Sequence, residues 1–274
     1  TDFDFEGSNL SVLIDTLAYN TYVTAYNTNM VANESFIDSA TLRENVVALA
    51  RNVGYVPSSR RASTANVSFT VDLGSGTTKS SVTLKAGLVA LGDFANTNYT
   101  FCTPEDITSP VNDGFAEFTI DIKQGTFVTN EFVVDTSQPN QKFVIPNPYV
   151  DTSTLKVQVR DTLTSSSRKT YSQIDNIVGI STHSETFLIQ EVQDEKYELL
   201  FGDGVLGKRL SNGNVVNSTY IVTDGVNGNG VANFSFSGKL VDNDGGLITS
   251  GISDIITNQR SSNGAEVESI DTIR

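Results

Sequence analysis

The sequence is poor in the residues that build metal sites and covalent active sites. Its 274 residues include one cysteine, one histidine, one methionine and no tryptophan. A single cysteine rules out an intrachain disulfide, and without cysteine or histidine pairs there is no ligand set for zinc. Cys102 is interpreted as a small buried residue, and His183, in the polar stretch Ser-Thr-His-Ser, as an ordinary surface histidine. We expect no metal site, no catalytic residue and no cofactor.

Positive charge is also scarce. Lysine and arginine number 18 against 32 acidic residues, which gives a net charge of -14. Nucleic acids and anionic membranes attract clustered lysine and arginine, so we expect neither nucleic-acid binding nor direct membrane binding. No apolar run approaches the roughly 18 residues of a membrane span. Acidic pairs are frequent, but none stands out as a glycosidase pair, and Asp242-Asn-Asp244 departs from the spacing of an EF-hand.

The N-terminal region, residues 1–57, has sustained helical periodicity that the rest of the chain lacks. We expect a first helix from Ser8, its N-cap, then a short joint and a second helix. Two apolar stripes run along the first helix, and at about 100° per residue they lie on roughly opposite sides of it, 180° apart. One stripe comprises Leu10, Leu13, Ile14 and Leu17, and the other comprises Val12, Tyr19, Val23, Tyr26 and Met30, with Tyr22 beside it.

The second helix is short. Thr41-Leu-Arg-Glu44 fits a capping box, Gly54 suits the left-handed position after the last turn, and Pro57 prevents continuation. Its predicted apolar face consists of Leu42, Val46, Leu49 and Val53.

A helix that is apolar on two sides needs neighbours on two sides. The second helix can cover one stripe but not both, so the pattern predicts a bundle that another chain completes. The alternative is a hairpin packed wholly on its own β region.

Sequence of β type follows the hairpin. Alternation from Val67 to Leu73 predicts a half-buried strand, and a glycine turn at 74–76 predicts that 81–85 returns as its hairpin partner. Further strands are predicted at 99–102, 115–122, 126–134, 142–145, 155–159, 171–174, 185–192, 197–201 and 215–222.

Prolines around Asn147 predict a boundary between two β modules. The predicted domains are a helical hairpin at 1–57, a first β module at 63–146, a second at 147–223, and a linker with the start of a further region at 224–274, where a helix begins near Glu266. The predicted fold class is α+β, with mainly antiparallel, sandwich-like β modules. Gly202, Asp203, Gly204 and Gly207 are interpreted as a tight structural turn that needs positive φ.

Several segments in order along the chain point to one family. They are DFEGSNL from Asp4, then LIDTLAYN, then ESFIDSATLRENVVALARNVGYVP ending at Pro57, LFGDGVLG from Leu200 and NGAEVES from Asn263. They resemble the baseplate wedge proteins of T-even-type contractile-tailed phages, in the wider baseplate J-like group. Asn263 and Glu266 replace a glycine and an aspartate that are usual in the last segment.

The resemblance implies a structural component of the virion tail baseplate rather than an enzyme. The implied partners are a second copy of the chain and other wedge subunits, among them a large wedge protein and a sheath-initiating lysozyme-like subunit, assembled into a ring around the tail hub. One stripe of the first helix would pack on the short helix and the other on another subunit, in either assignment. The ring-forming part of the family would lie beyond Arg274.

Two other classes remain as alternatives. A receptor- or glycan-binding β module of a tail fibre would need exposed aromatic platforms, and the chain has no tryptophan to supply them. A polysaccharide-degrading enzyme would need paired carboxylates in a pocket, one of them with a raised pKa. Neither alternative explains the leading helices.

Overall fold

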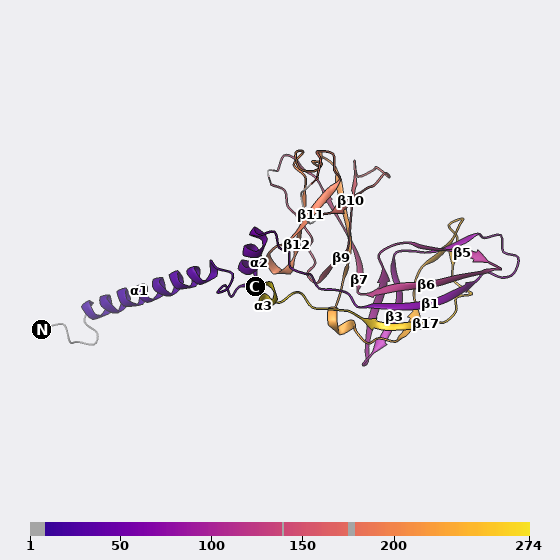
Figure 1. Cartoon of the computed structure of the whole chain (residues 1–274), viewed down its shortest axis with the longest axis horizontal. Coiled ribbons are helices and arrows are strands. Elements are labelled where there is room, and N and C mark those ends of the chain that lie inside the picture. Colours follow the sequence, from indigo (N-terminus) through magenta and orange to yellow (C-terminus); the bar gives the residue numbers. More distant parts are fainter. Residues whose placement is uncertain (1–8, 139, 175–178) are drawn as a thin grey trace. The chain divides into compact units, whose positions relative to one another are not determined.

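The chain divides into a helical unit and a β unit in the computed structural model, which describes residues 9–138, 140–174 and 179–274. The helical unit comprises Thr1–Pro57 together with Ser269–Arg274, and the β unit comprises Ser58–Glu268. Within the helical unit lie α1 (Asn9–Glu34), α2 (Arg43–Asn52) and α3 (Ile270–Ile273) (Figure 1). The expected N-cap, Ser8, lies outside the described residues.

The helical unit has a small apolar core built by α2 and α3. Its buried members are Ala40, Val46, Val47, Ala50 and Ile273, and Ile37, Leu49 and Ile270 pack against them. The helix expected near the C-terminal end is therefore present, and its apolar side is buried.

The end of α2 confirms the predicted glycine stop. Gly54 has a φ of 82°. Its amide donates to the carbonyl of Arg51, and the amide of Tyr55 donates to the carbonyl of Ala50, which is the Schellman arrangement.

Two expectations for α2 are wrong. Leu42 and Val53 are 50% and 82% exposed, because α2 turns Val46, Val47 and Ala50 inward instead. The capping box does not form, since α2 starts at Arg43 with Leu42 as N-cap. The amide and hydroxyl of Thr41 donate instead to Glu34, at the end of α1.

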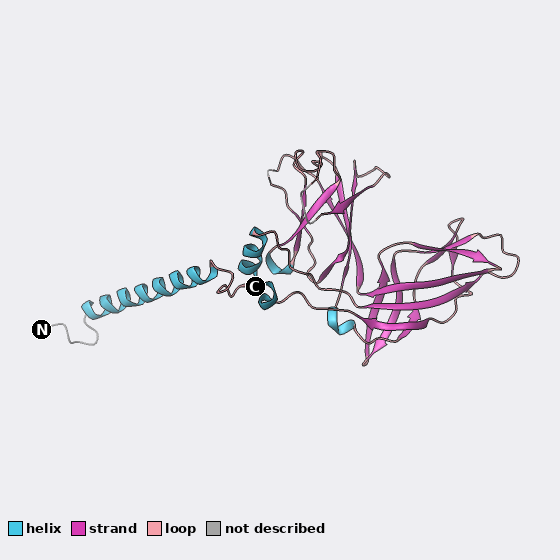
Figure 2. Cartoon of the chain, viewed as in Figure 1, coloured by secondary structure: helices cyan, strands magenta, loops and turns pink. Residues whose placement is uncertain are grey.

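The strands of the β unit form two sheets (Figure 2). Among the described strands, each pairing is antiparallel except that of β10 with β11, which confirms the α+β class. The first sheet contains β1 (Thr64–Asp72), β2 (Ser81–Leu84), β3 (Gly87–Phe94), β4 (Thr97–Thr103), β5 (Ile107–Asn112), β6 (Phe115–Gln124), β14 (Asn233–Phe236), β15 (Leu240–Asp242), β16 (Leu247–Ile248) and β17 (Ile256–Ser262). The second contains β7 (Thr126–Val133), β8 (Phe143–Val144), β9 (Val150–Arg160), β10 (Lys169–Gln173), β11 (Thr186–Glu191), β12 (Tyr197–Phe201) and β13 (Val215–Val222).

The boundaries of these sheets differ from the predicted β modules. The chain passes from the first sheet to the second at Gly125, between β6 and β7, and not at the prolines near Asn147. Gly125 has a φ of 133°, and a Cβ there would lie 2.3 Å from the carbonyl oxygen of Val222. Residues 233–262, predicted as part of a linker, return to the first sheet as β14 to β17.

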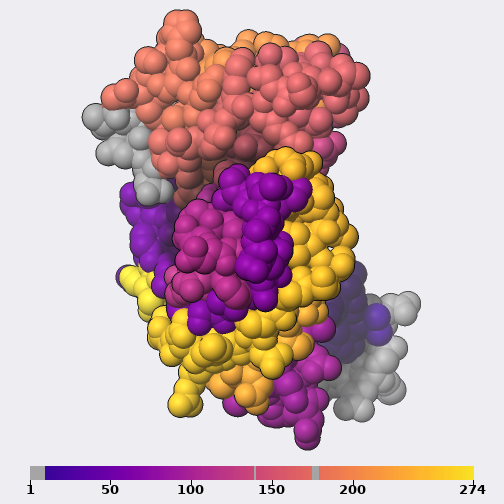
Figure 3. All heavy atoms as spheres, turned by 90° about the vertical axis from the view of Figure 1, so that its right-hand side faces the viewer, coloured from indigo at the N-terminus to yellow at the C-terminus, as the bar shows by residue number. Residues whose placement is uncertain are grey.

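The predicted hairpin of β1 with β2 does not form. Both edges of β1 are occupied, one by β6 along the whole strand and the other by β17. In the space-filling view of Figure 3, purple atoms from the early strands lie beside yellow atoms from near the C-terminal end, as this pairing requires. The strand β2 pairs instead with β5 and β15.

A buried polar network joins the two sheets where the chain crosses between them. Gln124 is 1% exposed. Its amide donates to Asp224, and its carbonyl oxygen accepts the hydroxyl of Thr223. Nearby, buried Asp151 accepts the amide of Ala62. Because the buried side chains of Gln124, Thr223 and Asp151 all have partners, the network stabilises one arrangement of the sheets within the β unit.

Candidate functional site: an exposed helix with two apolar seams

The helix α1 carries the largest set of exposed apolar residues in the described part of the helical unit. None of its described side chains is buried. Val23 is half-buried, and the other predicted interface residues are exposed, from Leu10 at 39% to Tyr22 at 69%. The expectation that one stripe packs on the short helix is thus wrong, because the α2–α3 core contains no residue of α1. The predicted interface residues of α1 whose exposure lies between these two values include Leu13, Ile14, Leu17, Tyr19, Tyr26 and Met30.

The threonines of α1 extend its apolar stripes. The hydroxyls of Thr16, Thr21 and Thr28 each donate to the carbonyl four residues earlier, at 2.8 Å. Because each hydroxyl is satisfied within the helix, these threonines add no unpartnered donor to a contact surface.

With the threonines included, two seams run along most of α1 with the alternating spacing of three and four residues that coiled coils use. We call them the leucine seam and the tyrosine seam. The leucine seam consists of Leu10, Ile14, Leu17, Thr21, Thr24, Thr28 and Val31, with Leu13 beside it. The tyrosine seam consists of Val12, Thr16, Tyr19, Val23, Tyr26 and Met30, with Tyr22 beside it.

Charge is nearly absent from α1. Asp15 and Glu34 are its charged residues, and Glu34 is the last residue of the helix. A surface helix normally carries charged residues on its solvent side, so an almost uncharged helix with two seams suits contact with protein on both sides. No helix among the described residues is long and apolar enough to cross a membrane.

The predicted glycine turn lies in the β unit, after β12. Gly204 and Gly207 have φ values of 93° and 84°, as predicted. A Cβ on Gly202 would lie 2.2 Å from the carbonyl carbon of Gly207. The carboxylate of Asp203 accepts the amides of Val205 and Leu206, which lowers the pKa of Asp203. All of these contacts lie within the turn, so the conformation of the turn is explained without a bound ligand.

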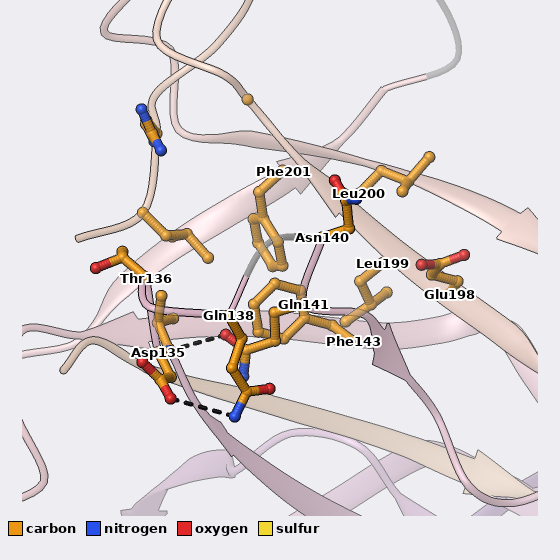
Figure 4. A pocket seen from close by; sticks show the side chains of 14 residues that line it. Asp135, Thr136, Gln138, Asn140, Gln141, Phe143, Glu198, Leu199, Leu200 and Phe201 are labelled. Atoms are coloured by element: carbon orange, nitrogen blue, oxygen red, sulfur yellow. Dashed lines mark hydrogen bonds between the residues drawn. The ribbon is translucent and has the colours of Figure 1, made fainter. Parts of the chain in front are cut away.

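A cavity of about 450 Å³ opens beside Phe143 and Phe201 in the second sheet (Figure 4). The Asp135 carboxylate at its rim accepts hydrogen bonds from the hydroxyl and amide of Ser137 and from Gln138. The bonds from Ser137 are the main cause of a lowered pKa for Asp135. A general acid needs the opposite shift, so Asp135 does not fit the acid of a polysaccharide-degrading enzyme.

The other residues considered for chemistry have ordinary surroundings. Burial raises the pKa of the Cys102 thiol to about 12, which keeps it protonated. His183 is exposed and lies 2.9 Å from the hydroxyl of Thr182. The ammonium of Lys79 contacts both Asp242 and Asp244. Within the described ranges, no group of three or more histidine, cysteine or acidic residues could hold a metal ion.

Comparisons with known proteins agree with the resemblance noted in the sequence. Residues 1–55 match the family model of the helical domain of gp6-like baseplate wedge proteins. The chain is also 29% identical over 259 residues to the baseplate wedge protein gp6 of Enterobacteria phage T4. That match covers 87% of this chain and 38% of the relative, so the chain spans less than half the length of that protein.

Proposed function

We propose that this chain is a baseplate wedge protein, a structural component of the virion tail baseplate, and that it assembles through α1 with a second copy of itself and with other wedge subunits. A large wedge protein and a sheath-initiating lysozyme-like subunit are among the proposed partners. The role is structural and requires no catalysis. The proposal extends to the ring of wedges around the tail hub.

One observation carries the proposal: α1 has two apolar seams, and none of its described side chains is buried. Contiguous exposed apolar surface on a soluble protein marks an interaction site. The matched family model, which describes a helical domain, covers the same part of the chain.

The energetics favour burial of both seams. Each leucine or isoleucine that moves from water into an interface contributes roughly 1.5–3 kcal/mol. The internal hydroxyl bonds of Thr16, Thr21 and Thr28 mean that burial leaves no unpaired donor at these positions. Association must offset a loss of translational and rotational freedom of at least about 4 kcal/mol, so several seam residues are needed on each side.

The test uses neighbouring substitutions that add the same charge on and off a seam. Tyr26→Asp lies on the tyrosine seam, whereas Asn27→Asp lies between the seams. Similarly, Leu17→Asp lies on the leucine seam and Asn20→Asp does not. The mass of each variant in solution, and its recovery with co-expressed wedge subunits, would be measured.

We expect each seam variant to lose at least one partner while its matched control keeps both. A substitution on the seam that binds the second copy should lower the solution mass of the chain alone. A substitution on the seam that binds another subunit should abolish co-purification with that subunit. If Tyr26→Asp and Leu17→Asp both assemble like Asn27→Asp and Asn20→Asp, α1 is not the assembly interface.

A further inference from the structure

The joint, defined as residues 34–42, holds the end of α1 against the start of α2. Glu34 is the last residue of α1, and its carboxylate accepts four hydrogen bonds. The donors are the amide and hydroxyl of Thr41 at 2.8 and 2.6 Å, the amide of Leu42 at 3.3 Å and the side-chain amide of Asn45 at 2.7 Å. Glu34 thereby partners backbone donors ahead of the first turn of α2, where a negative charge is favoured.

A second group holds the same joint from α3. The guanidinium of Arg274 donates to the carbonyl of Ile37 at 3.2 Å and to the carbonyl of Ala40. Ala40 is fully buried and Ile37 packs on the α2–α3 core. The Asp271 carboxylate lies 3.3 Å from the guanidinium of Arg274. The joint is therefore fixed to the core at one point and to α1 at another.

We propose that Glu34 and Arg274 act as positioning residues that fix the direction in which α1 leaves the α2–α3 core, and thereby orient both seams toward their partners. This inference rests on the proposed role of α1 in assembly. No described α1 side chain belongs to that core, so apolar packing does not hold α1 in place. Its direction depends on the polar contacts of the joint.

The length of α1 makes its direction consequential. A helix of 26 residues is about 39 Å long, so a rotation of about 10° at the joint moves its far end by roughly 7 Å. This exceeds the 5.4 Å pitch of a helix. A seam displaced by that amount no longer meets the knobs and holes of its partner in register.

Distances between two spin labels in the whole chain test the inference without any partner. The labels are attached at Asn20→Cys in α1 and Asn52→Cys in α2, both exposed positions, with the buried Cys102 replaced by alanine. In this background we compare Glu34→Ala, Thr41→Val and Arg274→Met with the matched control Glu44→Gln, an exposed acidic residue in the first turn of α2.

We expect one narrow distance distribution in the parent and in Glu44→Gln. Glu34→Ala should broaden it at least twofold, and Thr41→Val and Arg274→Met by less. Thr41→Val removes the hydrogen bond from the Thr41 hydroxyl to Glu34 and keeps the other three. Its distance distribution therefore tests the inference if Glu34→Ala does not fold. An unchanged width in every folded variant would overturn the inference.

The outcome separates this inference from the proposed function. If the width is unchanged while Tyr26→Asp still prevents assembly, the positioning role is wrong and the assembly role of α1 stands. If Glu34→Ala broadens the distribution but Tyr26→Asp assembles normally, the joint orients a helix that is not the interface, and the inference about partner orientation is overturned with the proposed function.

Discussion

Two tyrosines show how differently the two units of this chain use their apolar residues. Tyr220 in β13 is fully buried, and its hydroxyl donates to Asn147 at 2.6 Å and accepts the amide of Asn130. Tyr26 in α1 is 60% exposed. The hydroxyl of Tyr220 finds its hydrogen-bond partners within the β unit, whereas Tyr26 of α1 is exposed to solvent.

The difference teaches what holds each region in its structure. Most helical stability in proteins comes from packing of an apolar face rather than from intrinsic propensity. The threonines, asparagines, valines and tyrosines that dominate α1 are mediocre helix formers. We therefore expect α1 to be the least stable helix in the free chain and to gain stability when partners cover its seams.

The largest expected contrast comes from one substitution made in both units. Tyr220→Ala should lower the free energy of unfolding by about 3–5 kcal/mol, because it leaves a cavity and two unpaired polar side chains. Tyr26→Ala should change it by less than about 0.5 kcal/mol, because the side chain has no buried contact. A urea titration followed by far-ultraviolet circular dichroism measures both. Equal losses would mean that Tyr26 packs within the chain.

The second contrast compares two valines on or beside α2. Val46 is fully buried and Val53 is 82% exposed. Val46→Ala should destabilise the helical unit by about 2 kcal/mol, which corresponds to roughly thirtyfold faster hydrogen exchange of α2 amides. Val53→Ala should leave that exchange nearly unchanged. A larger increase in exchange for Val53→Ala than for Val46→Ala would instead support the apolar face of α2 that was predicted from the sequence and includes Val53.

The smallest expected effect concerns acid. Hydrogen bonds from the side chains of Thr41 and Asn45 lower the pKa of Glu34 from 4.5 to about 2. Because the folded pKa is the lower one, the carboxylate stabilises the joint fully above about pH 4.5, and this contribution is lost as the pH falls toward 2. The spin-label distribution of the joint should broaden over that range.

Two controls assign the acid effect to Glu34. Glu34→Gln should be broad already at neutral pH and should change little with acid. The Asp271 carboxylate lies 3.3 Å from the guanidinium of Arg274, so Asp271→Asn tests whether this carboxylate is responsible. A pH response that survives in Glu34→Gln and disappears in Asp271→Asn would contradict the assignment.

Much of the fold could be predicted where a local pattern determines it. Alternation located β6, β12 and β13 to within about two residues, and Gly54 marked the stop of α2. Sheet membership could not be predicted, because it depends on pairing between distant segments such as β1 and β17. A register shift between Leu88 and Ala90 obscured the alternation of β3.

For the candidate site, the apolar residues of α1 could be identified from their spacing, but their exposure could not. The same spacing fits a helix that packs on its own chain. Likewise, Thr41 and Glu44 matched a capping box, although Thr41 donates to Glu34 instead. A sequence motif cannot show that a carboxylate from the preceding helix competes for the same donors.

Hydrogen exchange of α1 amides, measured by mass spectrometry in the free chain and in the complex with co-expressed wedge subunits, tests the central claim most directly. We predict that α1 is folded but only weakly protected in the free chain, and that its protection increases by about a hundredfold or more in the complex, along both the leucine and the tyrosine seams. Central strands of the β unit, such as β6 and β13, should remain protected in both states. Equal protection of α1 in the free chain and in the complex would contradict the claim that its seams are the assembly interface.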